Sequence, residues 1–526
     1  MRWLLVAVLA VPAAGALLAA FLPSRAGQVA GTVAAAVTLA LSVPLYRDSW
    51  FSYGPAAVRP WHEVDLTWVP GLDLRFHLGV DGVSYPLVVL TGLLTLLCCA
   101  YTLWRAPAPG LSRSRSLRSL AAPGGRRDPA SSLRSLDRIL PALGRGHTLV
   151  ALLLVIEVGI LGTFLALDLV LFFVFFEVVL LPMYAVIAVW GGDDRAHAAR
   201  KFVLYTLFGS VLLLVGVFTV VVSAGTADIV ALTGGGELSR GTQIAAFVLL
   251  AIAFAVKSPL WPLHTWLPDA HTQAPTVGSV ILAGVLLKMG TYGLIRVGVG
   301  VAPEGARWAA PVLGILAVAA IVAGSLVCLA QTEIKRLIAY SSVGHMGFVL
   351  LGIATLTTTG IQAALIGNVA HGVITGLLFF LAGAIKERAH TGELAQLGGL
   401  REQSPWLAGL LAFAAIASLG LPGLAGFWGE AFAVVASLDK GGPLWTTLAA
   451  VAAVGGALTA AYFLRLLRRV THGPAVGVLD PPGLARAEVA AWAPLVLLAL
   501  VVGLLPALVL GMAGDPVGAL VEAVGS

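Results

Sequence analysis

Long apolar segments recur along the whole chain, and they constrain its fold more than any other feature. Runs of about 20 residues, the length that a helix needs to cross a hydrocarbon core of ~30 Å, follow one another from residue 3 to residue 513. Only 11% of the residues are charged and 59% are hydrophobic, whereas an average soluble domain carries roughly 25% charged residues. The sequence therefore predicts a polytopic membrane protein and excludes an ordinary soluble enzyme.

The apolar segments divide into about fourteen predicted membrane spans, so the expected fold class is all-α. The predicted spans cover residues 3–22, 28–45, 84–104, 148–167, 168–190, 201–223, 243–264, 275–297, 308–329, 334–353, 360–385, 405–436, 443–467 and 490–513. The first segment has the early arginine, apolar core and small residues of a signal peptide. Its length and the many spans that follow it favour an uncleaved helix instead.

Lysine and arginine are distributed unequally between the two sets of alternate loops. The loops after odd-numbered spans hold most of them, including the arginines from Arg105 to Arg145, Lys335 and Arg468, whereas Arg296 belongs to the poorer set. Short loops rich in Lys and Arg remain cytoplasmic. With an even number of spans, we expect both termini on the periplasmic or exterior side of a bacterial cell membrane.

Composition also separates a loop from the spans around it. Residues 105–147 are rich in Arg, Ser, Pro and Gly, which is typical of a flexible segment. Its charge indicates either a solvated insertion that helps fix topology or a surface for anionic lipid headgroups or an acidic partner. The expected organisation is a three-helix segment at 1–104, the loop at 105–147, five-helix repeats at 148–297 and 308–467, and a C-terminal helix and tail at 490–526.

Signatures of metal and nucleotide binding are absent from the sequence. Cys98, Cys99 and Cys328 lie inside apolar runs without CxxC spacing, so packing is their expected role rather than metal ligation or disulfide formation. No GxGxxG or GxxxxGK[ST] motif follows a strand-like segment, and no HExxH occurs. We expect no cofactor and no metal on this chain.

Several ionisable residues lie near the middle of predicted spans or beside a break in one. Placing a charge at the bilayer centre costs at least ~2.5 kcal/mol, so such residues indicate function by default. These residues are Glu157, Glu177, Lys257, Lys288, His345, His371 and Glu430.

Each of these residues also has a structural interpretation. A lysine can snorkel towards the cytoplasm, although Lys257 and Lys288 are too central for this to be favoured. A glutamate can be a satisfied carboxylate between helices, which is a stronger alternative for Glu157 than for Glu177. The two membrane histidines can be core residues bonded to backbone carbonyls.

Four further polar residues are assigned to the ends of spans. We expect His264 and His271 at or close to the cytoplasmic surface, either as capping or loop residues or at a proton entrance. Asp168 and Asp269 are expected in loops or at helix ends.

Helix-breaking residues interrupt two predicted spans near their middle. Span 243–264 contains KSPLWP from Lys257, and span 405–436 contains GLPGLAG from Gly420. Proline removes a backbone donor, and unwound backbone at membrane depth is tolerated only where it is buried in protein or lines a watered cavity. The breaks lie five spans apart, in two groups of five helices, so homologous groups would form an inverted repeat. Interrupted helices at corresponding positions point to a transport site.

The pair of Glu177 and Lys257 is a candidate proton switch. Two charges ~8 Å apart at an effective dielectric of ~20 interact by about 2 kcal/mol. Movement of Glu177 towards or away from Lys257 would therefore change whether the lysine holds its proton.

Four stretches resemble the antiporter-like membrane subunits of respiratory complex I, and among them the subunit M family. They read FLALDLVLFFVFFEVVLLPMY, FAVKSPLWPLHTWLPDAHTQAPTVGSVILAGVLLKMGTYGLIR, QTEIKRLIAYSSVGHMGFVLLGI and GLPGLAGFWGE, and they cover most of residues 148–436. The chain departs from the family at AGFWGEAF, where subunit M commonly reads GNFVGEF. The resemblance implies a proton-pumping membrane subunit of an NADH-quinone oxidoreductase, with relatives among Mrp-type cation/proton antiporters.

The resemblance also implies roles for individual residues. Glu177 matches the glutamate that pairs with the span-7 lysine, which is Lys257 here, and Lys288 matches the lysine of a central hydrated axis. Glu430 matches an acidic residue towards the proton exit. Glu157 and His345 match recurring polar positions of the family, and we expect His371 to serve with them as a secondary relay.

The resulting functional expectation is a subunit of a proton-translocating enzyme complex that has no redox centre of its own. NADH, FMN, iron-sulfur clusters and quinone would bind to partner subunits, among them adjacent antiporter-like subunits, and membrane lipids would surround the chain. The alternatives are a subunit of an Mrp-type Na⁺/H⁺ antiporter, a membrane subunit of a hydrogenase complex, and a scaffold with inert charges. Co-purifying partners would distinguish the NADH-quinone oxidoreductase, the Mrp antiporter and the hydrogenase complex.

Overall fold

The structure, a computed structural model, describes residues 2–46, 60–69, 74–105, 146–475, 479 and 483–525. Within these ranges, 14 helices are long and apolar enough to cross a membrane, which confirms the predicted polytopic, mainly helical class. The predicted Arg/Ser-rich segment 105–147 lies almost entirely outside the described residues.

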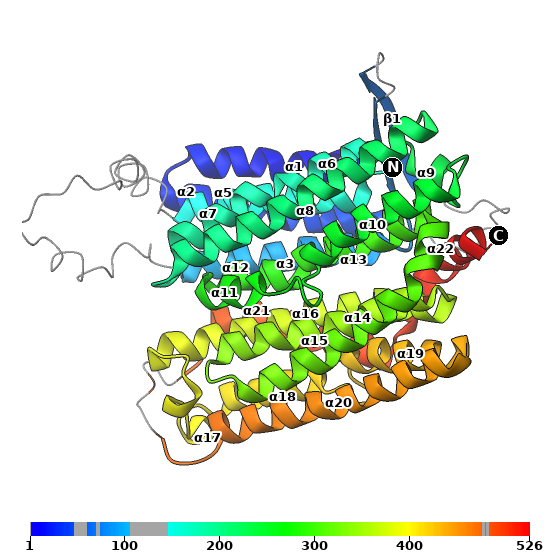
Figure 1. Cartoon of the computed structure of the whole chain (residues 1–526). Helices are drawn as coiled ribbons and strands as arrows, with labels where there is room; N and C mark the ends of the chain where they lie inside the picture. Colours follow the sequence, from blue (N-terminus) through cyan, green and yellow to red (C-terminus); the bar gives the residue numbers. More distant parts are fainter. Residues whose placement is uncertain are drawn as a thin grey trace, which may run out of the picture.

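The helices run alongside one another in one bundle, and the N- and C-termini lie towards the same end of it (Figure 1). The first part contains α1 (Arg2–Phe21), α2 (Ser24–Ser42), α3 (Tyr85–Trp104), α5 (Gly146–Leu165), α6 (Leu169–Val178), α7 (Leu180–Trp190), α8 (Arg195–Ala224), α9 (Ile229–Leu232) and α10 (Arg240–Lys257). After α11 (Trp266–Gln273), one span is built from α12 (Thr276–Ile281), the π-helical η6 (Leu282–Leu286), α13 (Leu287–Gly293) and the π-helical η7 (Leu294–Val299).

The second part of the bundle starts with three long helices. These are α14 (Pro303–Ala330), α15 (Ile334–Thr355) and α16 (Thr358–Ala389). They are followed by the short η8 (Leu394–Gln396) and α17 (Leu400–Gln403), and then by α18 (Pro405–Ser418), α19 (Ala425–Lys440), α20 (Gly442–Thr471), α21 (Arg486–Leu504) and α22 (Ala507–Gly525).

Both predicted breaks occur as helix interruptions. The helix α10 ends at Lys257, and a turn through Ser258 and Pro259 leads to α11. The predicted span 405–436 is divided into α18 and α19, with Gly420 and Gly423 at positive φ between them. Glycine adopts this backbone region at little cost, so GLPGLAG ends one helix and begins the next.

The C-terminal boundary differs from the sequence-based prediction. The predicted span 490–513 is divided at Leu505-Pro506, where α21 ends and α22 begins. A residue that precedes proline is sterically disfavoured in the α region, and Leu505 has φ −127 and ψ 62. The apolar composition continues across this turn, so hydropathy alone did not reveal it.

A β-hairpin is the second difference from the predicted all-α architecture. Strand β1 (His62–Val69) pairs antiparallel with β2 (Leu74–Val80), from His62 opposite Val80 onwards. The exposed Asp65 carboxylate accepts a hydrogen bond from Nε of Arg75 across the two strands at 2.8 Å. The hairpin is short and lies between two spans, so the search for membrane-length apolar runs did not detect it.

Two isolated backbone bridges occupy matching places in the chain. Asp168 pairs with Asp228 and Glu333 pairs with Glu393, so the second bridge is displaced from the first by the same number of residues at both of its ends. Figure 1 places α9, just after the first bridge, and α17, just after the second, at opposite ends of the bundle. An inverted repeat would produce this spacing, and the two five-helix repeats stay a prediction.

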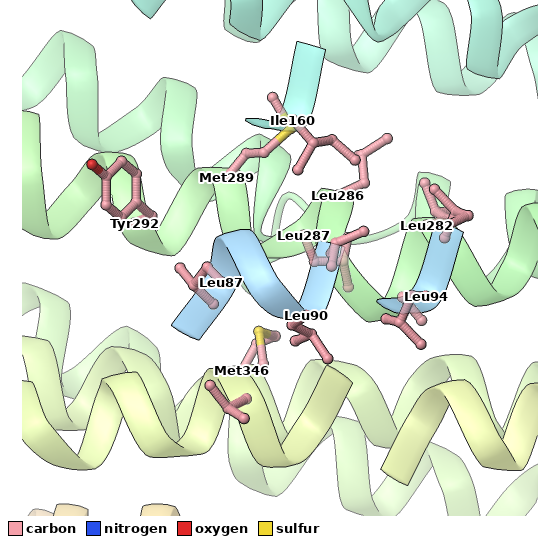
Figure 2. Packing of buried hydrophobic residues seen from close by; sticks show 14 of the residues in the cluster. Leu87, Leu90, Leu94, Ile160, Leu282, Leu286, Leu287, Met289, Tyr292 and Met346 are labelled. Atoms are coloured by element: carbon pink, nitrogen blue, oxygen red, sulfur yellow. The ribbon is translucent and has the colours of Figure 1, made fainter. Parts of the chain in front are cut away.

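Helix α3 joins the two parts of the bundle. Figure 2 shows Leu87, Leu90 and Leu94 of α3 among side chains of the span that contains η6 and α13, with Met346 of α15 nearby. The outward helix faces, in contrast, expose large apolar side chains such as Val222 of α8, which is 78% exposed. Such faces suit a chain whose surface meets hydrocarbon.

Replacing Asp168 by alanine is expected to lower stability by about 1 kcal/mol, the usual cost of losing an N-cap. Its carboxylate accepts hydrogen bonds from the backbone N–H groups of Val170 and Leu171, both at 2.9 Å. Thermal unfolding of the purified protein in detergent measures the loss. Asp168→Asn should retain most of the stability, and exposed Asp193→Ala is the matched control. An Asn variant as unstable as the Ala variant would contradict the capping role.

Candidate functional site

Lys288 lies at the centre of the bundle and has two close partners. It is fully buried in α13, directly after the π-helical η6, and such π-segments are frequent at functional sites. Its ammonium group donates a hydrogen bond to the carbonyl oxygen of Ala283 at 2.5 Å and contacts Nδ1 of His371 at 2.6 Å. The lysine predicted in one half of the chain therefore meets a histidine predicted in the other half.

The contacts continue from His371 towards Glu430. The rings of His371 and His345 lie 5.8 Å apart between centroids, and Nδ1 of His345 contacts a carboxylate oxygen of Glu430 at 2.8 Å. The hydroxyl of Ser418, the last residue of α18, lies 2.9 Å from Nε2 of His345. Glu430 follows the break between α18 and α19, so the interruption of this span brings its carboxylate to the histidines.

A small cavity lies beside the two histidines. It has a volume of about 30 Å³, and its lining includes His345, His371, Ser418 and Glu430. A cavity needs roughly 10–15 Å³ to hold one water molecule, so there is room for a water between polar groups. Nε2 of His371 has no hydrogen-bond partner within the described chain, which leaves it available to such a water.

Two glycines allow the helices to approach closely at this place. A Cβ atom at Gly372, next to His371, would lie 2.6 Å from the carbonyl oxygen of Gly284 and 2.7 Å from Leu90. Gly284 is the neighbour of Ala283, whose carbonyl oxygen binds Lys288. A second link between the same two helices is the hydrogen bond from Thr291 to Asn368 at 2.9 Å. The absence of side chains at the crossing thus sets the contact between Lys288 and His371.

Lys257 is buried without a hydrogen-bond acceptor among the described residues. It is the last residue of α10 and only 3% exposed, and its ammonium nitrogen lies over the ring of Phe176 at 4.6 Å. Glu177 follows Phe176 and accepts a hydrogen bond from the hydroxyl of Ser210 at 2.5 Å. Glu177 and Lys257 are not among the ion pairs within 4.0 Å in the described chain.

Two further sequence-predicted residues do not join the Lys288–Glu430 contacts. Glu157 of α5 is fully buried, and neither of its oxygens has a partner in the described part of the chain. His271 was expected at or close to the surface but is fully buried, with its ring stacked on Phe379 at 4.4 Å. The reason is that α11 packs against α8 and α15, which encloses its inward face.

Sequence reasoning missed a buried ion pair. Arg296, which was counted with the exterior loops although the predicted span runs to residue 297, lies in η7 and is only 3% exposed. It pairs with Asp81, which precedes α3 and is equally buried. Asp81 lies in a predicted loop and Arg296 at the very end of a predicted span, so neither position carried a signal of burial.

Lys335 and Asp269, both expected near the cytoplasmic surface, have specific partners in the structure. Lys335 is buried at the start of α15, and its ammonium donates to the carbonyl of Ala274 at 3.1 Å. Asp269, predicted in a loop or at a helix end, lies in the first turn of α11, and its carboxylate contacts Lys201 at 2.7 Å and Arg336 at 3.4 Å. These contacts join α8, α11 and α15 at one end of the bundle. Within the described residues, no group of three or more His, Cys, Asp or Glu side chains is arranged to hold a metal.

Comparison with known proteins places this geometry in a family. Residues 166–457 match the transmembrane family described as NADH:quinone oxidoreductase/Mrp antiporter. The chain belongs to this family. Glu177, Lys257, Lys288, His345, His371 and Glu430 all lie inside the matched region, whereas Glu157 lies outside it.

Similar proteins extend over almost the whole chain. NADH-quinone oxidoreductase subunit M of Rhodobacter capsulatus is 38% identical over 99% of this chain and 97% of that protein. Subunit M of Rickettsia typhi is 39% identical over 84% of this chain and 82% of that protein. The chain is therefore a relative of subunit M, as the sequence motifs indicated.

Solved structures show the same family fold. A chain of respiratory complex I from Thermus thermophilus with bound NADH is 27% identical, with a TM-score of 0.82 over 99% of this chain and 100% of that chain. A chain of the Mrp complex from Dietzia sp. has a TM-score of 0.81 over 100% of both chains at 23% identity, which shows the fold alone.

Proposed function

We propose that the chain is a proton-translocating membrane subunit of an NADH-quinone oxidoreductase, coupled to electron transfer in other subunits. Relatives named subunit M that match nearly full length support this membership. In this proposal the chain is part of a translocase, and NADH, FMN, iron-sulfur clusters and quinone bind to partner subunits. It would reside in a bacterial cell membrane with both termini on the periplasmic or exterior side.

One observation supports proton transfer most directly, namely the line of contacts from Lys288 through His371 and His345 to Glu430. All four groups can hold or release a proton. A histidine can accept a proton on one ring nitrogen and release one from the other. These four side chains follow one another from the first half of the bundle to the second, and each lies close to the next.

The first proposed step is transfer from the Lys288 ammonium to Nδ1 of His371, its partner at 2.6 Å. Nε2 of His371 then releases a proton through a water in the adjoining cavity. His345 receives it on Nε2, beside the hydroxyl of Ser418. Nδ1 of His345 passes a proton to Glu430, which releases it towards the exterior.

The proposed input to this relay comes from Lys257 and Glu177. A buried lysine without a hydrogen-bond partner holds its proton only while a carboxylate or water offsets the burial. Charge displaced in a neighbouring subunit would act on Glu177, which is half-buried, and so change the proton affinity of Lys257. Lys257 would then pass its proton towards Lys288, and Glu157 stays a weaker candidate for the same step.

His345→Asn is expected to lower proton pumping by at least about tenfold, because an amide fills similar space but cannot relay a proton. The measurement is acidification of proteoliposomes that contain the purified complex, driven by NADH and quinone. His390→Asn makes the same substitution at an exposed helix end and should pump normally. Normal pumping by the His345 variant would overturn the relay.

Co-purification tests the proposed membership. An affinity tag on this chain should recover flavoprotein and iron-sulfur subunits together with other antiporter-like membrane subunits. Recovery of Mrp subunits would instead support the Na⁺/H⁺ antiporter alternative, and recovery of a nickel hydrogenase would support the hydrogenase-complex alternative.

A further inference from the structure

A large cavity lies at the end of α20, away from the proposed proton path. Its volume is about 730 Å³, and it is lined by Leu397, Gly398, Leu464, Arg465, Arg468, Arg469, His472, Gly473 and Pro474. Figure 1 places the neighbouring α17 at the end of the bundle opposite α9. By the distribution of cations among the loops, this end is the predicted cytoplasmic end.

The cavity gathers positive charge on one face of a helix. Arg465, Arg468, Arg469 and His472 follow the i, i+3, i+4, i+7 spacing that puts side chains on the same side. Like charges at this spacing repel one another. The negative end of the helix dipole offsets part of this repulsion for Arg468 and Arg469, which lie in the last turn of α20, and a bound anion would offset the rest.

No carboxylate of the described chain provides that anion. None of the described acidic residues forms an ion pair with the three arginines within 4.0 Å. Arg465 donates a hydrogen bond to the carbonyl oxygen of Leu329, and His472 contacts the hydroxyl of Thr471 at 2.7 Å. The guanidinium groups of Arg468 and Arg469 are exposed, so they are available to an external anion.

The outward face of α20 leads from the membrane interior into this cluster. Val454 and Leu464 are 61% and 55% exposed, and the exposed Ala457 and Ala461 lie between them at steps of three and four residues, which follow one face of the helix. Leu464 lines the cavity itself. An apolar stripe thus ends at a basic pocket, which is the arrangement that would hold both parts of a lipid molecule.

We propose that this pocket binds the headgroup of an anionic phospholipid, with an acyl chain along Val454 and Leu464. Arginine is suited to phosphate because its planar fork can donate two parallel hydrogen bonds to two oxygens. Basic pockets between helices on the cytoplasmic side are suited to such headgroups. A free phosphate ion would use the arginines but not the apolar stripe.

The test is retention of defined lipids by the purified, delipidated complex, measured by native mass spectrometry. In wild type, phosphatidylglycerol should be retained in preference to phosphatidylcholine. The double variant Arg468→Gln/Arg469→Gln should hold phosphatidylglycerol at least about tenfold more weakly, because two charge-assisted hydrogen-bonding groups are lost. The double Lys variant, which keeps the charge, should retain an intermediate affinity.

The matched control is Arg200→Gln, which removes an exposed arginine from α8 and should leave lipid retention unchanged. Inorganic phosphate at millimolar concentration should not displace the lipid. Equal retention by the Gln double variant, equal retention of phosphatidylcholine, or full displacement by phosphate would each overturn the proposal. Lipid retention is measured without proton pumping, so the lipid-binding proposal can fail while the proposed function holds, and the reverse.

Discussion

Replacing Lys257 by alanine is expected to reduce proton translocation to the background leak while the complex still assembles. Lys257 has no hydrogen-bond acceptor among the described residues, and its ammonium nitrogen lies over the ring of Phe176, the residue next to Glu177. Without the amine, a charge displaced at Glu177 has no proton to move. Proton flux is measured with a pH-sensitive dye inside proteoliposomes during NADH oxidation.

The same variant breaks no hydrogen bond within the described residues, although it removes the ammonium group from over the ring of Phe176. Removing a charge from mid-membrane also removes a burial cost of at least ~2.5 kcal/mol, which offsets the loss of that contact. We therefore expect subunit composition and thermal unfolding close to wild type. Glu177→Ala should show the same loss of pumping, because it removes the other member of the switch.

Arg240→Ala provides the matched control for Lys257. Arg240 begins the same helix α10 and is exposed, so it tests the effect of removing a cation from this helix. We expect normal pumping from this control. Intact proton pumping in Lys257→Ala or Glu177→Ala would refute the proposed switch.

The sequence singled out four residues that lie together in the structure, but it did not predict how they contact one another. Lys288, His371, His345 and Glu430 stood out because a polar group in an apolar span has a high cost, and the structure brings them together. Their contacts depend on a π-helical segment and on two glycines that face each other. Neither feature changes the hydropathy of the sequence. The chain contains 61 glycines, so composition does not distinguish these two from the others.

Burial at the ends of spans was the least predictable property. Arg296 and Lys335 lie at the ends of the predicted spans 275–297 and 334–353 and were counted with the adjoining loops, because hydropathy marks where an apolar run ends, not where the bundle stops covering a side chain. Both are buried with specific partners, Asp81 and the carbonyl of Ala274. His271 was misplaced for the same reason, since it follows the end of the predicted span 243–264 and was expected at or close to the cytoplasmic surface. Contacts between segments that are distant in the sequence decide whether these residues are buried, and such contacts cannot be predicted from one sequence.

The close approach of helices at Gly372 offers a way to test geometry separately from chemistry. Gly372→Ala leaves every titratable group in place, but its Cβ atom would lie 2.6 Å from the Gly284 carbonyl oxygen. Backbone on the other side cannot swing away as a side chain can, so the two helices must separate by a few tenths of an ångström or more. The contact between Lys288 and His371 would lengthen with them.

Gly372→Ala is therefore expected to reduce proton pumping severalfold to about 100-fold, since a misplacement of about 1 Å can cost that much in a transfer step. Overpacking should also lower the free energy of unfolding by roughly 1–3 kcal/mol, which thermal unfolding of the complex detects. Gly376→Ala is the matched control, because the same substitution one turn later meets Leu94, Val280 and Leu495 at 3.5–3.9 Å, which are ordinary van der Waals distances, and it should pump normally. If Gly372→Ala assembles, shows the loss in stability and still pumps at the wild-type rate, protons do not pass directly between Lys288 and His371.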